Sequence, residues 1–116
     1  MSSQLLHASI TRVRDAHVVR FRGEVDMSTA VLFEQTISAA AAAETTSIIL
    51  DLTEVTFFGA TGVALLVAAA RGHCQTLGIP VRLMSSGAVR NALRSCGVDR
   101  AFDVIDSPAD ALAGTA

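Results

Sequence analysis

The sequence predicts an α/β fold: one domain with a mixed, mostly parallel sheet of about five strands, an N-terminal β-hairpin and about four helices. Two observations predict this class. Short segments rich in Val and Ile alternate with longer segments whose apolar residues recur at helical spacing. Two strand-like segments also follow each other at the N-terminus, where they can pair as a hairpin. We expect residues 1–116 to form a single domain with a core over about 5–113.

The hairpin is expected from two arms, Leu6 to Arg14 and His17 to Arg22, joined by the turn Asp15-Ala16. In the second arm apolar and arginine residues alternate with the period of two that is typical of a strand. The same rule predicts that one face of the hairpin carries four arginines, Arg12, Arg14, Arg20 and Arg22. Such a patch is either the solvated face of a sheet or a surface for an acidic partner.

Helices and strands then alternate. Gly23 to Met27 is a connector, and Ser28 is the predicted N-cap of a helix that runs to about Ala43. Ser47 to Leu52 contains a continuous apolar run, Ile48-Ile49-Leu50, which is typical of a central strand covered on both faces. The remaining elements are a second apolar piece over Val55–Phe58, a helix from about Gly62 to Leu77, a strand from Pro80 to Met84, a helix capped by Ser85 or Ser86 and ended by Gly97, a strand over Ala101–Ile105, and a terminal helix that opens at Ser107.

Composition excludes several classes of protein. With 51% hydrophobic residues the chain is too apolar to be disordered, and a net charge of −2 argues against a nucleic-acid binder. The longest uncharged run, Val55 to Ala70, is shorter than the roughly 20 residues of a membrane span. The first residues lack the features of a signal peptide. We therefore expect a cytoplasmic protein that does not insert into a membrane.

The candidate reactive groups do not assemble into a catalytic or metal site. Asp26, Asp51 and Glu54 have no histidine or nucleophile in a suitable pattern, so we interpret them as solvated loop carboxylates. The sequence contains no phosphate-binding glycine motif and no Lys, and we expect no cofactor. Cys74 and Cys96 lie on neighbouring predicted helices, where they are either two reduced thiols or a redox switch.

The most unusual segment is the helix after Thr61. Thr61 itself is either the N-cap of that helix or a functional residue. Gly62 to Ala70 contains no polar residue, and a helix that is apolar all round should be buried all round. A domain of this size with one sheet rarely encloses a helix completely. The first turns of this helix are therefore a predicted protein-docking patch, unless a loop or the terminal helix covers them.

Four motifs in order carry a family resemblance: Gly23-Glu24-Val25-Asp26, Ile48–Leu52 with Val55–Phe58, Gly62-Val63, and Cys96-Gly97-Val98 followed by Phe102. Together they resemble the STAS domain of bacterial anti-sigma factor antagonists over nearly the whole chain. In that family the loop before the helix reads D-S-[ST]-G, and its first Ser is phosphorylated by the partner, an anti-sigma factor with a kinase-type ATP site. The unphosphorylated antagonist binds the anti-sigma factor and so frees a sigma factor, and phosphorylation disrupts the interface by repulsion and desolvation.

This sequence departs from the family at the phosphorylated position. Gly59 stands where the family has Asp, Ala60 stands where it has the phosphorylated Ser, and Thr61 keeps the second hydroxyl. Ala60 cannot accept phosphate. Thr61 is therefore a candidate phosphorylation site, unless the protein binds constitutively or responds to another signal.

The resemblance implies a non-enzymatic protein that binds an anti-sigma factor. The expected partner-binding residues are Asp26, Phe58, Gly59, Ala60, Thr61, Gly62, Val63, Ala64 and Val67. Two alternatives stay open: an accessory STAS subunit of a lipid or anion transporter, and a nucleotide-binding protein or enzyme. The oligomeric state is not predicted.

Overall fold

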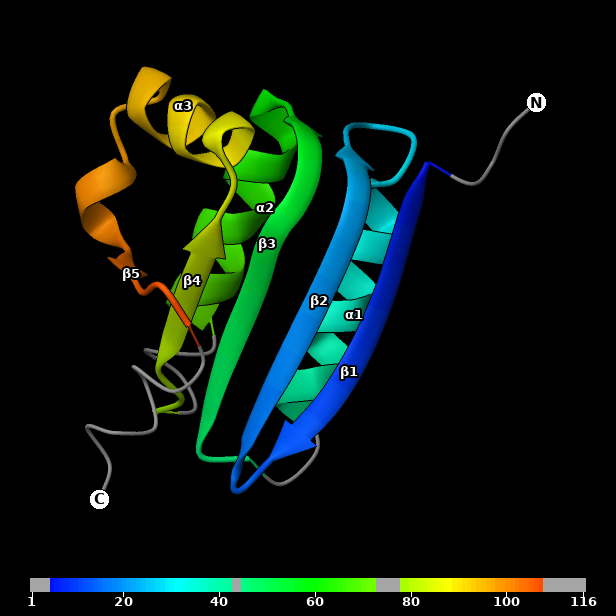
Figure 1. The fold of residues 1–116 in the computed structure, drawn as a ribbon, viewed down its shortest axis with the longest axis vertical. Helices are drawn as coiled ribbons and strands as arrows, with labels where there is room; N and C mark the ends of the chain where they lie inside the picture. Colours follow the sequence, from blue (N-terminus) through cyan, green and yellow to red (C-terminus); the bar gives the residue numbers. More distant parts are fainter. Residues whose placement is uncertain (1–4, 43–44, 73–77, 108–116) are drawn as a thin grey trace.

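The computed structural model describes residues 5–42, 45–72 and 78–107 (Figure 1). The elements in chain order are β1 (Leu6–Val13), β2 (Ala16–Val25), α1 (Ala30–Ala42), β3 (Ser47–Phe58), α2 (Ala60–Ala70), β4 (Val81–Ser85), α3 (Gly87–Ser95), the 3₁₀ turn η2 (Asp99–Ala101) and β5 (Asp103–Val104).

The five strands form one sheet in the order β1-β2-β3-β4-β5. Only β1 and β2 pair antiparallel, and the other neighbours are parallel. Successive right-handed crossovers in one direction place their helices on the same face of a sheet. Figure 1 accordingly shows α1 behind β1 and β2, and α2 behind β3 and β4.

These features confirm the predicted α/β class, the hairpin and the five-stranded sheet. The described ranges contain three α-helices and the turn η2 instead of about four helices. The fourth helix, expected to open at Ser107, falls on residues 108–116, which lie outside the described residues.

The central strands are longer than predicted. β2 continues to Val25 and so includes part of the expected connector, and β3 is one strand where two pieces were expected. β3 has one more residue than β2 between the pairs Arg20–Asp51 and Arg22–Glu54, and a second extra residue before Phe57. The insertions change the side-chain alternation, so Val55 and Phe58, three residues apart, both face the core.

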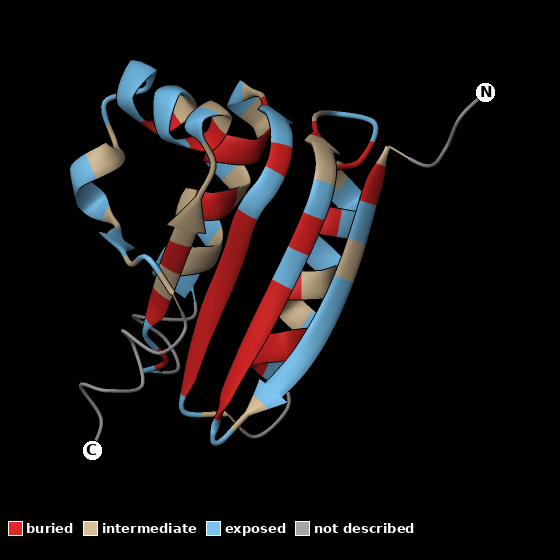
Figure 2. Ribbon diagram, in the orientation of Figure 1, coloured by how far each residue is buried: buried red, intermediate tan, exposed pale blue. Residues whose placement is uncertain are grey.

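The main core lies between the helices and the sheet (Figure 2). Phe33 of α1 contacts two strand residues: its ring centroid lies 4.7 Å from that of Phe21 and 5.9 Å, edge-on, from that of Phe58. The predicted apolar stripe of α1 is confirmed, because Phe33, Ile37, Ala40 and Ala41 are all buried. These contacts fix α1 against β2 and against the end of β3 that precedes α2.

A smaller apolar cluster lies on the opposite face of the sheet. Ala16, Val18 and Ile49 are buried there, with Val13, Met84 and Ile105 packed around them. The prediction that Ser47 to Leu52 is covered on both faces is confirmed, and within the described ranges the cover on this second face comes from strand and loop residues.

The predicted four-arginine face is wrong. Arg12 lies opposite His17, whose Nδ1–H donates to the backbone of α1, so Arg12 is on the helix side of the sheet. Arg20 and Arg22 lie on the other side, and Arg14 is in the turn with φ +56°. Two residues that lie directly opposite each other share a face of the sheet, and in this register each such pair combines an even-numbered residue with an odd-numbered one. Even-numbered residues of β1 and even-numbered residues of β2 therefore lie on opposite faces.

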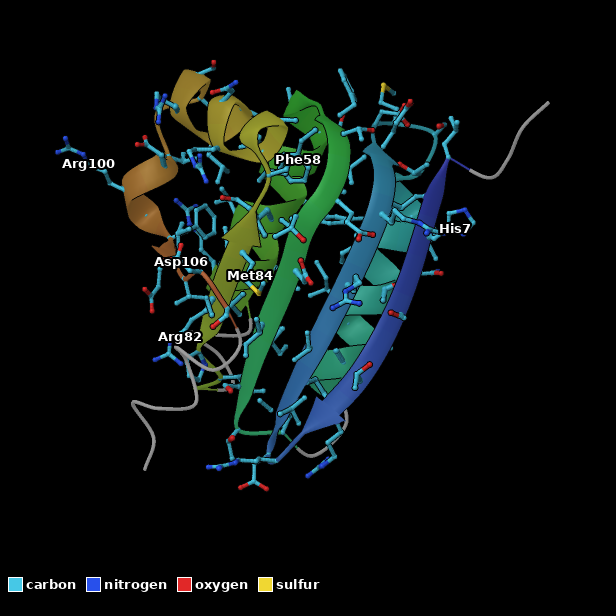
Figure 3. All side chains as sticks on the ribbon, viewed as in Figure 1. His7, Phe58, Arg82, Met84, Arg100 and Asp106 are labelled. Carbon is cyan, nitrogen blue, oxygen red and sulfur yellow. The ribbon has the colours of Figure 1, made fainter. Side chains whose placement is uncertain are left out.

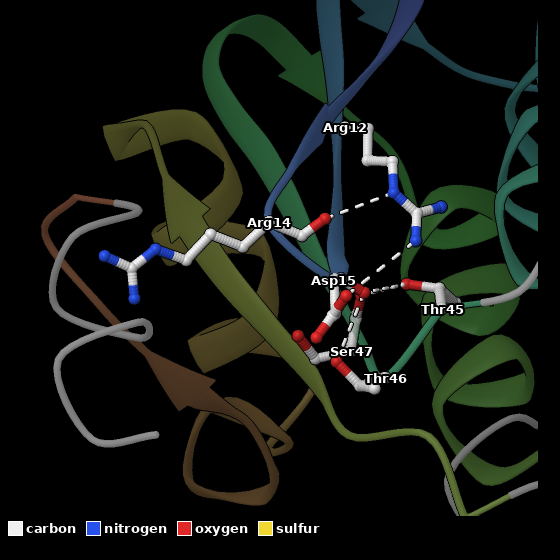
Figure 4. A network of polar contacts seen from close by, with 6 residues as sticks. All are labelled: Arg12, Arg14, Asp15, Thr45, Thr46 and Ser47. Atoms are coloured by element: carbon white, nitrogen blue, oxygen red, sulfur yellow. Dashed lines mark hydrogen bonds and ion pairs between the residues drawn. The ribbon is translucent and has the colours of Figure 1, made fainter. Parts of the chain in front are cut away.

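The hairpin turn is joined to the start of β3. The carbonyl oxygen of Asp15 accepts hydrogen bonds from the Thr46 N–H and the Thr45 hydroxyl, both at 2.9 Å (Figure 4). The Arg12 side chain folds toward the same turn: its Nε–H donates to the Arg14 carbonyl oxygen at 3.1 Å. The closed end of the hairpin is thereby held to the third strand.

The ends of α3 agree with the prediction. The Ser86 hydroxyl oxygen accepts a hydrogen bond from the Val89 N–H at 3.3 Å, which is the geometry of an N-cap. The same hydroxyl donates to the Val55 carbonyl oxygen at 2.7 Å and so joins α3 to β3. After the helix, Gly97 has φ +73°, the left-handed conformation that commonly ends a helix.

Candidate protein-docking site

The carboxyl ends of β2 and β3 bring two loops together. Val25 and Phe58 are neighbours in the register, and each strand then leads into a helix. The Gly59 N–H donates to the Val25 carbonyl oxygen at 3.0 Å, which joins the two loops directly. In Figure 1 both loops lie at the upper end of the sheet. We call residues 26–29 and 57–64 together the docking surface.

Asp26 shapes the first loop. Its Oδ1 accepts hydrogen bonds from the Ser28 N–H at 2.8 Å and the Ser28 hydroxyl at 2.6 Å. The pKa of Asp26 is lowered below its ordinary value, and the hydrogen bond from the Ser28 hydroxyl is the largest cause. The Ser28 N–H and the Thr29 donors contribute less, and burial has the opposite effect. Asp26 is therefore ionised at neutral pH, and its observed role is to hold the loop.

The same carboxylate explains why the predicted cap is wrong. Ser28 was expected to cap the helix, but α1 begins at Ala30, and the Phe33 N–H donates to the Thr29 carbonyl oxygen at 3.1 Å. Ser28 instead lies in the turn that Asp26 closes. The buried Thr29 hydroxyl completes the loop by donating to the Glu24 carbonyl oxygen at 2.8 Å.

The second loop is shorter than predicted, because α2 begins at Ala60 and not at about Gly62. Gly59 is the N-cap, with φ −83° and ψ 178°, and no side chain caps the helix. Thr61 therefore lies in the first turn and does not cap it. Within the described part of the chain, the Thr61 hydroxyl makes no hydrogen bond, and this side chain is half-buried.

Gly62 lets α2 lie close to the ends of both strands. A Cβ at this position would lie 2.9 Å from Val25 Cγ1 and 3.1 Å from the Phe58 ring. Real Cβ atoms essentially never come within 3.0 Å of a heavy atom that is distant in the chain. The resemblance assigned Gly62 to the opening of the helix, and the structure shows that its position is a packing requirement.

The predicted partner-binding residues divide by depth. Phe58 at the end of β3 (Figure 3) and Val63 are each only 5% exposed, and Gly62 is buried too. Ala60 and Ala64 are exposed, and Asp26, Gly59, Thr61 and Val67 are intermediate. The buried residues support the surface from below, and the exposed alanines form part of it.

Sequence reasoning missed a group of large exposed apolar side chains at this end of the molecule, to which Leu32 (42% exposed) also belongs. Met27 is 82% exposed, Val31 in the first turn of α1 is 66% exposed, and Phe57 is 50% exposed. The adjacent Phe57 and Phe58 were a usable signal, since neighbouring residues of a strand point to opposite faces and only one of them can enter the core. The docking surface is thus apolar and contains one carboxylate.

A separate apolar groove runs along the helices. It has a volume of about 210 Å³ and lies between α1 and α2, where Glu34, Ile37 and Ser38 face Leu65, Ala68, Ala69 and Gly72. Ala64 and Ala68 on the outer side of α2 are exposed, in agreement with the predicted incomplete burial of this helix.

The other candidate groups do not assemble into a site. Asp51 is only 3% exposed and lies within β3, so describing it as a solvated loop carboxylate was wrong. It accepts hydrogen bonds from Thr53 and from Arg20, whose Nε lies 3.0 Å from Asp51 Oδ2. Glu54 is exposed on the same strand. Among the described residues, no group of three or more His, Cys, Asp or Glu side chains could hold a metal ion.

The redox pair stays a prediction. Cys96 follows α3 and is an exposed free thiol. Cys74 lies outside the described residues. Over the ranges 5–42, 45–72 and 78–107, no helix combines the length and the hydropathy needed to cross a membrane.

Comparison with known proteins gives a consistent result. The family model described as the STAS domain matches residues 7–111. The anti-sigma-F factor antagonist RsfA of Mycobacterium tuberculosis is 30% identical over 116 residues, which cover 97% of this chain and 90% of RsfA. RsfB of the same organism, also an anti-sigma-F factor antagonist, is 29% identical over 84% of this chain and 79% of RsfB. A crystal structure of an anti-sigma factor antagonist from Mycobacterium paratuberculosis superposes with a TM-score of 0.80 and 28% identity, over 94% of this chain and 92% of that one.

Proposed function

Since the chain belongs to the STAS domain family, we propose that it is an anti-sigma factor antagonist that binds an anti-sigma factor of the kinase type through the docking surface and so frees a sigma factor. In this proposal it acts in the cytoplasm as a binding protein and not as an enzyme. The observation that carries the proposal is the pair of joined loops, which present exposed apolar groups of Met27, Phe57 and Ala60 on one end of the sheet.

The physical chemistry of this surface suits a protein partner. Large exposed apolar side chains lose contact with water when a partner covers them, at roughly 25 cal/mol per Å² of apolar area. The small residues Ala60 and Ala64 leave room for the side chains of a partner. The single carboxylate of the surface is already occupied by Ser28 and Thr29, so binding does not require a new ion pair.

Regulation is the second part of the proposal. Ala60 is exposed in the first turn of α2 but has no hydroxyl, so we propose that phosphorylation at this position does not control binding. The Thr61 hydroxyl is the nearest alternative, but its half-buried position hinders access by a kinase. Constitutive binding is therefore the form of the proposal that the geometry favours.

A binding titration with a cognate anti-sigma factor tests the first part. Ala60→Arg and Ala64→Arg should each weaken the complex at least tenfold, because they place a long charged side chain in the apolar surface. Ala101→Arg is the matched control, since Ala101 is an exposed alanine of η2 and should leave affinity unchanged. The absence of a complex with every cognate anti-sigma factor, with or without nucleotide, would contradict the proposal and favour the accessory-subunit alternative.

Incubation with the same kinase-type partner and ATP tests the second part. The natural chain should carry no phosphate on residue 60, and Ala60→Ser should become phosphorylated and lose affinity. Phosphate on Thr61 of the natural chain, detected by mass spectrometry, would refute constitutive binding and place the regulated site one residue later.

A further inference from the structure

The outer edge of β1 is open in the described sheet. β1 has eight residues, and among the described strands it pairs only with β2 (Figure 1). The opposite edge of the sheet, β5, has two residues. β1 is therefore the one long edge that the described sheet offers to another strand.

The direction of the backbone groups on β1 follows from one hydrogen bond. The Leu5 carbonyl oxygen accepts from the Glu24 N–H at 2.7 Å, so the polar groups of Leu5 point toward β2. Successive residues of a paired strand point their N–H and C=O groups to opposite sides. Leu6, Ala8 and Ile10 therefore direct theirs to the open edge.

Little on this strand prevents pairing. Natural edge strands are commonly protected by Lys, Pro, a bulge or a very short length. β1 contains neither Lys nor Pro, its register with β2 is regular, and its exposed Ile10 adds apolar surface. The only charged residue, Arg12, folds toward the hairpin turn, where its guanidinium lies 3.9 Å from the Asp15 carboxylate (Figure 4).

We propose that β1 binds β1 of a second copy of this chain, antiparallel and about a two-fold axis, and so joins two five-stranded sheets into one. With Ser9 opposite Ser9 of the second copy, Ala8 lies opposite Ile10 in two symmetric pairs. In both pairs the N–H and C=O groups point toward the other strand, so each pair makes two hydrogen bonds. In each of these pairs the small side chain of Ala8 lies beside the large side chain of Ile10. His7 lies opposite Thr11 of the second copy, so two charges of the same sign do not meet.

The dimer is independent of the proposed function. The docking surface lies at the carboxyl ends of β2 and β3, and the dimer uses the length of β1, on which His7 marks the upper part (Figure 3). Each dimer therefore presents two docking surfaces. A single strand pair buries less than about 1,200 Å², which predicts a weak dimer with a Kd of roughly 10 μM or above.

Sedimentation equilibrium from roughly 10 μM to 1 mM tests the proposal. The average mass should rise from 12.1 kDa toward twice that value. Ile10→Lys places a charge on the edge and should keep the protein monomeric. Val104→Lys is the matched control, because Val104 is 46% exposed on the short opposite edge and Ile10 is 41% exposed. A constant mass over the whole range, or an equal effect of both variants, overturns the proposal.

Amide hydrogen exchange identifies the surface. The N–H groups of Ala8 and Ile10 should exchange more slowly as concentration rises, and those of Ser9 and Thr11, which already face β2, should not change. Ala8→Pro removes one outward N–H, which an edge strand tolerates, and should abolish dimerisation while circular dichroism shows an intact fold. A doubled mass without this alternating protection would mean that another surface, or another strand, joins the copies, and it refutes the β1 pairing.

Discussion

A methyl group added at Gly62 should destabilise the protein, although the same change normally favours a helix. Replacing Gly by Ala inside a helix stabilises it by about 0.8–1.0 kcal/mol. At Gly62 the new Cβ would lie 2.9 Å from Val25 Cγ1, and both Val25 and Phe58 are buried, so neither can move away freely. Forcing one carbon into a packed core costs about 1–3 kcal/mol. The expected net effect of Gly62→Ala is a loss of about 1 kcal/mol.

Gly87 provides the matched control. It is the first residue of α3, and a Cβ built there meets no heavy atom within 4 Å. Gly87→Ala should stabilise the protein by about 0.4–1 kcal/mol, because it restricts only the unfolded chain. Urea unfolding followed by circular dichroism measures both changes, and each kcal/mol corresponds to roughly 4–8 °C in Tm. If Gly62→Ala stabilised the protein as much as Gly87→Ala, α2 would not pack against the strands as described.

Three further predictions concern residues outside the docking surface. Burial opposes ionisation of Asp51, but hydrogen bonds from Thr53 and then Arg20 outweigh it and lower the pKa of Asp51. The ionised Asp51 therefore stabilises the fold fully above the unfolded pKa of about 3.9, and this stabilisation is lost as pH falls through the lower folded pKa. Urea unfolding at several values between about pH 7 and pH 3 tests this. Compared with the natural protein, Asp51→Asn should be less stable at pH 7 and should lose less stability on acidification. Ser86→Ala removes both the N-cap of α3 and its link to Val55, and should lower the free energy of unfolding by about 1–2 kcal/mol; no change in the urea midpoint would mean that water replaces the hydroxyl. Arg14→Gly should raise Tm, since φ +56° costs a non-glycine residue about 1–2 kcal/mol, and a lower Tm would show that the Arg14 side chain stabilises the turn.

Much of the fold could be predicted from periodicity. The spacing of Phe33, Ile37, Ala40 and Ala41 identified the buried face of α1, and the continuous run at Ile48–Leu50 identified the central strand. The two extra residues in β3 could not be predicted, because strand register depends on which residues of the neighbouring strand are paired. The same limit led to the wrong arginine face, since the assignment of a face also depends on register.

The position of the candidate site could be predicted from sequence motifs, but its detailed geometry depends on three-dimensional contacts. The Asp26 carboxylate satisfies the backbone of Ser28 and Thr29, which moves the start of α1 past the predicted cap. The role of Gly62 requires the positions of Val25 and Phe58, which are distant from each other in the chain. Which of Phe57 and Phe58 is exposed depends on the insertions in β3.

The hydrogen bond from Gly59 to Val25 also bears on the kinetics of association. Because it joins the two loops in the free protein, we expect little chain ordering, and little of the entropic cost of ordering a loop, when the proposed complex forms. The association rate constant should then lie in the ordinary range for rigid surfaces, about 10⁵–10⁷ M⁻¹s⁻¹. Substitutions on the surface should act mainly on the lifetime of the complex, so stopped-flow dissociation will distinguish them better than the rate at which the complex forms.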